Sequence, residues 1–243
     1  MSETLLIETA GHRVTMTLSR PARANAMDWN MLEALDAAFR DIEMRDDVDA
    51  VVIKGAQGHF CSGWDVAHPV NQPEEALRLN QRGRELIERV QRCPAITVAV
   101  LEGAVIGGGL LLAAACDIRI GMPPLRLCLP EVNFNVPVLW TGLSPLVREI
   151  GFSATRELAF SGKTYDAQWA TQRGFISECL DEDALPAGLG SLLNNIDRGN
   201  GRALRTMKRD LTRLSDAVMP GAHDYGDEQV VDSVMNSILA KRG

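Results

Sequence analysis

Three short segments of the sequence hold residues whose types and spacing could do chemistry together. The first, residues 60–65 (FCSGWD), contains Gly63, which permits a tight turn that leaves the following backbone N–H groups free to face a ligand. The second is the glycine triplet 107–109, which precedes an apolar run. If that run is a helix, its first N–H groups are unpaired and carry a partial positive charge, which suits an oxyanion.

The third segment, residues 129–132 (LPEV), places a carboxylate in an apolar neighbourhood. Burial of Glu131 would raise its pKa and make it a candidate for carrying protons. Each segment alone also has an ordinary structural explanation, since glycine triplets commonly serve as turns and a glutamate beside proline is commonly at the surface. Trp64, in the same way, can be a packing anchor. The chemical interpretation therefore needs all three segments together.

Other kinds of active site find no support in the sequence. A GxSxG motif is absent and the four histidines form no HxxxH or HExxH pair, so neither a serine hydrolase of that type nor a zinc site is expected. SGKT at 161–164 is set aside as a phosphate loop, because that motif needs a glycine where Glu157 stands. The triplet 107–109 lacks the spaced third glycine of a dinucleotide fingerprint. We therefore expect no metal and no redox cofactor.

Bulk properties narrow the possible partners and the location. A net charge of −7 argues against non-specific nucleic-acid binding, although a local basic patch, such as the cations of 197–213, can still meet an anionic ligand. The five cysteines form no CxxC pair and indicate reduced, mostly buried thiols. The sequence shows no signal-peptide pattern, and no apolar run approaches the roughly 20 residues that span a bilayer. We therefore expect a cytoplasmic protein that binds neither nucleic acid nor membrane.

Alternating strands and helices must position the three segments. Val14, Met16 and Leu18 alternate with polar residues, which predicts a half-buried strand. Asp28 is a plausible N-cap for a helix with a regular apolar face. The short strand–helix–strand spacing favours an α/β fold with largely parallel strands, followed by a mainly helical region from about residue 140. The expected strands are 12–19, 48–55, 95–103 and 117–121, and the expected helices after the first are 75–92 and 110–116.

The order of these segments closely resembles that of the enoyl-CoA hydratase/isomerase (crotonase) superfamily. The matching pieces run in family order from about residue 5 to residue 213, and their joint order and spacing make the resemblance specific. They are LSRPARANAMD, VVIKGAQGHFCSGWDV, AITVAVLEGAVIGGGLLLAAACDIRIG, LCLPEVNFNVP, LAFSGKTYDAQWATQRGFISECL and MKRDL.

The resemblance implies a crotonase-type spiral of ββα repeats, with a helical C-terminal region that assembles a homo-trimer or, as a dimer of trimers, a hexamer. On this basis we expect a spiral core with an acyl-CoA site at 1–190 and an oligomerisation region at 191–243. The resemblance also implies that the backbone N–H groups of Trp64 and Gly108 form the oxyanion hole for a thioester carbonyl. It places Arg23, Ala24, Ala26, Ser62, Asp65, Val66 and Leu111 along the CoA and substrate path, with Lys208 at the CoA phosphates.

The most informative departure from the family pattern is Leu111. Hydratases of this family carry two glutamates, one on the helix after the glycine triplet and one in the PE segment. Here the first position is Leu111 and the second is Glu131. Hydration with two carboxylates is therefore poorly supported, whereas moving a proton from C2 to C4 needs only one base. We favour a Δ3–Δ2 enoyl-CoA isomerase with Glu131 as the single acid/base.

Two alternatives stay open. EVNFNVP resembles single-glutamate relatives, such as feruloyl-CoA hydratase-lyases, which hydrate or cleave special acyl groups. A non-catalytic acyl-CoA-binding scaffold is the alternative of another class, and the retained Glu131 argues against it. Trp64 stands where the family often has a small residue, and Asn135 replaces a usual glycine whose left-handed backbone asparagine tolerates. CoA enters as part of the substrate, so no separate cofactor is expected.

Overall fold

The computed structural model describes residues 4–68, 70, 72–199, 201–219, 232 and 236. The strands are β1 (Leu5–Ala10), β2 (Arg13–Leu18), β3 (Ala50–Gly55), β4 (Ile96–Leu101), β5 (Ala104–Ile106), β6 (Ile118–Gly121), β7 (Arg126–Cys128), β8 (Thr164–Tyr165) and β9 (Glu178–Cys179). The helices are α1 (Trp29–Glu43), α2 (Pro73–Arg92), α3 (Gly108–Ala115), α4 (Leu143–Ser161), α5 (Ala167–Gln172), α6 (Leu185–Arg198) and α7 (Gly201–Val218), with 3-10 helices η1 (Pro21–Arg23) and η2 (Pro130–Phe134).

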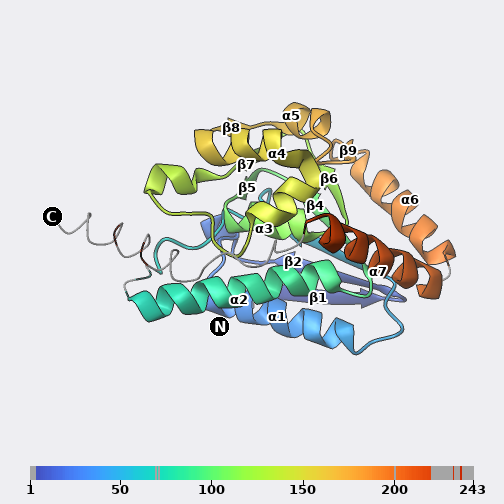
Figure 1. The fold of residues 1–243 in the computed structure, drawn as a ribbon. Helices are drawn as coiled ribbons and strands as arrows, with labels where there is room; N and C mark the ends of the chain where they lie inside the picture. The colour runs from blue at the N-terminus through green and yellow to red at the C-terminus, as the bar shows by residue number, and fades with distance from the viewer. Residues whose placement is uncertain are drawn as a thin grey trace.

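A six-stranded sheet in the order β1-β2-β3-β4-β6-β9 forms the centre of the fold (Figure 1). β1 and β2 pair antiparallel, whereas the pairs from β2 through β3, β4 and β6 to β9 are parallel. A second sheet has the order β5-β7-β8, in which β5 and β7 are parallel. This is the α/β arrangement with largely parallel strands that the sequence predicts.

Sequence patterns in the first half account for the elements found there. β2 alternates buried and half-buried residues, and residues 50–53 of β3 are all buried, as expected for a strand covered on both faces. Asp28 caps α1, because its Oδ1 accepts a hydrogen bond from Met31 N at 2.9 Å. α2 begins at Pro73, since proline suits the first turn of a helix. α3 begins earlier than expected, at Gly108, inside the glycine triplet.

Helices cover the two faces of the six-stranded sheet. α1, α2 and α3 contribute to a large core cluster in which Phe39 and Leu86 are fully buried. α6 belongs to a separate cluster, in which Leu193 and Ile196 pack against Val52 and its neighbours on β4 and β6. Figure 1 shows α1 and α2 side by side and α6 and α7 at another side of the molecule.

The fold brings the segment 60–65 beside the glycine triplet. β3 and β4 are neighbouring parallel strands, so the chain leaves the sheet at the same edge after each of them. Cys61 N donates to Ala104 O at 2.9 Å, and Ile106 N donates to Cys61 O at 3.0 Å. The segment is therefore tied to β5, which leads directly into the triplet. β5 and β7, of three residues each, were not expected, because so short a strand shows no periodicity.

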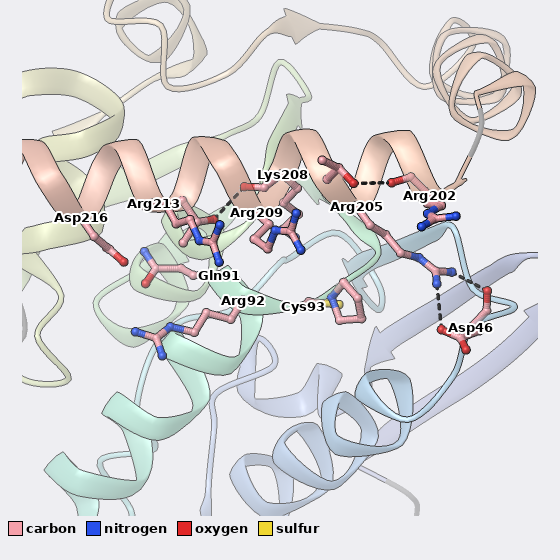
Figure 2. Close-up of a pocket in the computed structure, with 13 residues that line it drawn as sticks. Asp46, Gln91, Arg92, Cys93, Arg202, Arg205, Lys208, Arg209, Arg213 and Asp216 are labelled. Atoms are coloured by element: carbon pink, nitrogen blue, oxygen red, sulfur yellow. Dashed lines mark hydrogen bonds and ion pairs between the residues drawn. The ribbon is translucent and has the colours of Figure 1, made fainter.

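α7 carries the basic run of the sequence along a cavity of about 860 Å³, whose other wall includes the C-terminal end of α2 (Figure 2). None of the three chemical segments lines this cavity. Lys208 Nζ lies 2.6 Å from Asp117 Oδ2 and 2.8 Å from Ala95 O, and Lys208 is 7% exposed. Burial and this ion pair give Lys208 a structural role within the chain. Its expected contact to CoA phosphates stays a prediction.

The expected division of the chain at 190/191 falls inside α6 and stays a prediction. Much of 191–243 lies outside the described residues. Among the helices that the structure describes, none is long and apolar enough to cross a membrane.

Candidate active site

The backbone N–H of Trp64 points away from the segment that pairs with it. Met27 N donates to Gly63 O at 2.7 Å, and Asp65 N donates to Met27 O at 2.8 Å. Since successive N–H groups of an extended segment point to opposite sides, these two bonds turn the N–H of Trp64 to the other side. That N–H donates to no other described residue. Gly63 adopts φ +92°, so the tight turn expected at this glycine is confirmed.

Gly108 offers a second backbone donor at the N-terminus of α3. Its N–H is at the first position of the helix, where no intrahelical partner exists, and it donates to no other described residue. Gly107, at φ +51°, donates instead to Cys128 O at 2.9 Å. A Cβ atom on Gly63 would lie 3.5 Å from Gly108 N, so the loops that carry Trp64 and Gly108 are in contact. The structure therefore brings the two expected donors into one region.

The carboxyl of Glu131, on η2, lies against the same glycine loop. A Cβ atom on Gly107 would come within 2.9 Å of Glu131 Oε1. Oε2 is buried and has no hydrogen-bond partner among the described residues. Burial disfavours the charged carboxylate and raises the pKa of Glu131 to about 7, an effect that a hydrogen bond from its own backbone reduces. The raised pKa expected from the sequence is confirmed, and it allows Glu131 to take and return a proton near neutral pH.

Apolar side chains lie beside the two donors. Leu111, one turn into α3, is 2% exposed. The six-membered ring of Trp140 packs on Gly108, since a Cβ atom there would lie 2.6 Å from Trp140 Cζ3. The rings of Trp64 and Trp29 meet edge to face with centroids 5.3 Å apart. Such surroundings strengthen a hydrogen bond to a developing negative charge, because the local dielectric is low.

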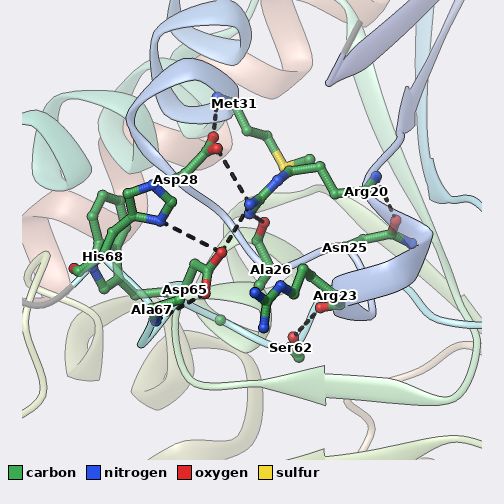
Figure 3. Close-up of polar contacts among 12 residues, drawn as sticks. Arg20, Arg23, Asn25, Ala26, Asp28, Met31, Ser62, Asp65, Ala67 and His68 are labelled. Carbon is green, nitrogen blue, oxygen red and sulfur yellow. Dashed lines mark hydrogen bonds and ion pairs between the residues drawn. The ribbon is translucent and has the colours of Figure 1, made fainter. Parts of the chain in front are cut away.

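Residues expected along the CoA path lie together around η1 (Figure 3). Ser62 N donates to Ala24 O at 3.0 Å, and Ser62 Oγ donates to Arg23 O at 3.0 Å. Arg23 and Val66 are exposed, with Val66 at 82%, whereas Ala26 is buried. This surface therefore combines exposed side chains with a well-anchored backbone next to Trp64.

Asp65 has an internal role in this region. It is 4% exposed, and its Oδ2 accepts a hydrogen bond from Arg20 at 2.8 Å (Figure 3). Burial alone would raise the pKa of Asp65, but hydrogen bonds from Arg20 and from Ala67 N, together with the charges of Arg20 and Arg23, lower it overall. Arg20 also donates to Ala26 O. The ionised Asp65 thus fixes the segment after Gly63 to the loop that carries Ala26.

Comparison with known proteins identifies the family. A model of the family described as enoyl-CoA hydratase/isomerase matches residues 9–241. The chain belongs to the enoyl-CoA hydratase/isomerase family. It is 31% identical over 200 residues to enoyl-CoA hydratase ACTT6 of Alternaria alternata, across 79% of this chain and 63% of that protein. It is 28% identical over 176 residues to ethylmalonyl-CoA decarboxylase of Danio rerio, across 72% of this chain and 58% of that protein. The chain thus spans less than two thirds of the length of these two relatives.

Solved structures of the enoyl-CoA hydratase/isomerase family confirm the expected fold. An enoyl-CoA hydratase/carnithine racemase from Magnetospirillum magneticum is similar with a TM-score of 0.84 at 27% identity, over 89% of this chain and 83% of that chain. The agreement confirms the α/β class and the crotonase-type spiral.

Two residues at the site of this enoyl-CoA hydratase/isomerase family member were not expected from the sequence. Arg20 bridges Asp65 at 2.8 Å and Asp28 at 3.4 Å. Its signal was its position inside the family segment LSRPARANAMD. Trp140 lies in a stretch without periodicity and adopts φ +61°, so no sequence pattern indicated that it faces Gly108.

Proposed function

We propose that this protein is an enoyl-CoA isomerase that moves the double bond of a 3-enoyl-CoA ester to the 2-position. The N–H groups of Trp64 and Gly108 bind the thioester oxygen, and Glu131 is the single acid/base. One observation carries the proposal: the buried Glu131 Oε2 has no partner in the described residues and the pKa of the carboxyl is about 7. The position of a second carboxyl, in the family pattern, holds the apolar Leu111.

The reaction needs one proton carrier and one site for an anionic oxygen. Ionised Glu131 takes a proton from C2, and the electron pair of that C–H bond delocalises over the carbonyl and the double bond. The two N–H groups donate to the resulting enolate oxygen, and losing one such donor typically costs roughly 3–4 kcal/mol. Protonated Glu131 then returns the proton to C4, which leaves the double bond between C2 and C3.

A hydratase or lyase that works with Glu131 alone is the second candidate. The names of two relatives favour it, since one is an enoyl-CoA hydratase and the other an ethylmalonyl-CoA decarboxylase. Their reactions can also pass through a thioester enolate, so the same two N–H groups would serve. A non-catalytic acyl-CoA-binding scaffold is the alternative of another class. An unpaired buried carboxyl argues against it, because such a group costs stability and needs a function to retain it.

We also propose that the CoA part of the substrate passes the surface formed by Arg23, Ala24, Ser62 and Val66, with Ala26 and Asp65 holding the backbone beneath it. Leu111 would contact the acyl group. CoA belongs to the substrate, and no separate cofactor is required by this chemistry.

We propose further that the protein is a cytoplasmic homo-trimer or hexamer. Exposed apolar residues of α7 recur at helical spacing and form one stripe, which is costly in water and favours coverage by another copy. They are Met207, Leu211, Leu214 and Val218, which are 54%, 66%, 63% and 80% exposed.

The experiment that tests the function is turnover of a 3-enoyl-CoA and of a 2-enoyl-CoA by the wild type and by Glu131→Gln. We expect the wild type to convert the 3-enoyl ester to the conjugated 2-enoyl ester without adding water, and the variant to lose this activity. Glu182→Gln removes a carboxyl at an exposed position and is the matched control, with unchanged turnover. Hydration of the 2-enoyl ester would favour the second candidate. Binding of CoA esters without turnover of either would favour the scaffold.

A further inference from the structure

Trp140 is held in an unfavourable backbone conformation at the proposed site. Its φ is +61° and that of the following Thr141 is +51°, a region that residues with a side chain seldom occupy. Trp140 N donates to Asn80 Oδ1 at 2.7 Å, and Asn80 is 4% exposed. Strain of this kind persists where the surrounding structure enforces it, and it gathers at functional sites. The surrounding structure therefore holds this indole in place against a cost in backbone energy.

The indole fills a space that two glycines from different helices leave open. A Cβ atom on Gly83, in the middle of α2, would lie 2.2 Å from Trp140 Cδ1 and Nε1. A Cβ atom on Gly108 would lie 2.6 Å from Cζ3 and 2.7 Å from Cη2. Glycine is unfavourable inside a helix, so Gly83 indicates that the close approach of the ring is specific. Trp140 is 3% exposed and closes the space between α2 and α3.

Two consecutive glycines contact the proton carrier and the indole. Glu131 touches Gly107, and Trp140 touches Gly108. A thioester oxygen bound to the N–H of Gly108 would have the first carbons of its acyl group close to both side chains. Leu111 extends the same wall, since a Cβ atom on Gly142 would lie 2.3 Å from Leu111 Cδ1.

We propose that Trp140 is a specificity-determining residue that limits this site to short acyl groups. The inference rests on the proposed function, because it requires an acyl-CoA ester at Trp64 and Gly108. A longer chain would have to enter the volume that the indole occupies, and side chains in close-packed surroundings do not yield such volume freely. Removal of the ring would open a channel between α2 and α3.

The test is binding of butyryl-CoA, octanoyl-CoA, dodecanoyl-CoA and free CoA, measured by isothermal titration calorimetry. For the wild type we expect butyryl-CoA to bind about 10-fold or more tightly than octanoyl-CoA, a discrimination that pocket shape can supply. Trp140→Ala should abolish or reverse this preference. Trp140→Phe, which keeps a ring in the same place, should retain it. Trp169→Ala makes the same chemical change on α5 and should leave the preference unaltered.

Equal affinity of the wild type for butyryl-CoA and dodecanoyl-CoA would overturn the inference and leave the proposed function standing. The same holds for a folded Trp140→Ala variant that keeps the preference for the short ester. If no ester binds more tightly than free CoA, the acyl site itself is misplaced and the proposed function fails too. Where Trp140→Ala does not fold, the wild-type series still tests the inference, because equal affinity for short and long esters overturns it.

Discussion

Replacing Glu131 with glutamine should stabilise the protein as the pH rises while it abolishes the activity. In the folded protein the pKa of Glu131 is raised from 4.5 to about 7, chiefly by burial. The folded state thus holds this proton more tightly than the unfolded state does. The contribution of the carboxyl to folding is therefore most favourable below pH 4.5 and is lost as the pH rises through 7.

The magnitude follows from the difference between the two pKa values. A rise from 4.5 to about 7 corresponds to about 3 kcal/mol of folding free energy that ionisation removes. Glutamine has nearly the same shape and stays neutral, so Glu131→Gln avoids this loss. The variant should match the wild type at low pH and exceed it by up to about 3 kcal/mol above pH 7. For a chain of this length each kcal/mol shifts Tm by about 2–4 °C.

The assay is urea unfolding of both proteins over a pH series, with Tm as a second measure. Only the difference between variant and wild type matters, because the other titrating groups are common to both. Glu182→Gln, at an exposed position, should show a difference that does not depend on pH. A flat difference for Glu131→Gln, or one that grows toward low pH, would refute a neutral, desolvated Glu131 and with it the acid/base assignment.

Three further predictions follow from contacts elsewhere in the structure. Gly108→Pro should turn over the 3-enoyl-CoA about 10²-fold more slowly than Gly108→Ala. Both variants add a Cβ atom against Trp140, and only proline removes the backbone N–H. Equal turnover by the two variants would exclude this N–H as a donor. Lys208→Met should lower the free energy of unfolding by about 2 kcal/mol in urea titration, since it leaves Asp117 without its ion pair. An unchanged Kd for free CoA in this variant would exclude the expected contact of Lys208 to CoA phosphates. Gly83→Ala should destabilise the wild type by about 1–3 kcal/mol, because the added Cβ atom overlaps with Trp140. In a Trp140→Ala background the same change should stabilise the protein by about 1 kcal/mol. Unfolding curves in which the stability changes in the same direction in both backgrounds would contradict the packing.

The parts of the fold that sequence reasoning predicted are those that local patterns determine. Asp28 sits three residues before the Met31 N–H that it caps, and the alternation in β2 directly reflects which side chains face the core. The turn at Gly63 and the raised pKa of Glu131 could also be predicted, because a turn glycine and a carboxylate among apolar residues each carry a local signal. The fold class followed from the order of such local elements.

What the sequence could not predict depends on contacts between distant segments. Lys208 stands in a strongly basic run, which suggested a cation available to a ligand, yet α7 buries Lys208 and pairs its ammonium with Asp117. Trp140 contacts Gly83 and Gly108 from an irregular stretch, and neither glycine reveals its partner. Their roles required the three-dimensional arrangement.

Leu111 connects the missing second carboxyl with the behaviour of Glu131. Burial, and not a neighbouring negative charge, is what raises the pKa of Glu131 to about 7. A second carboxylate at position 111 would add repulsion and couple the two titrations, so that neither group alone would be half protonated near neutral pH. An isomerase needs one group that is a competent base in the first step and a competent acid in the second, and the best pKa for both roles lies close to the working pH. Leu111 adds no such charge, so burial alone raises the pKa of Glu131, as the proposed isomerase requires.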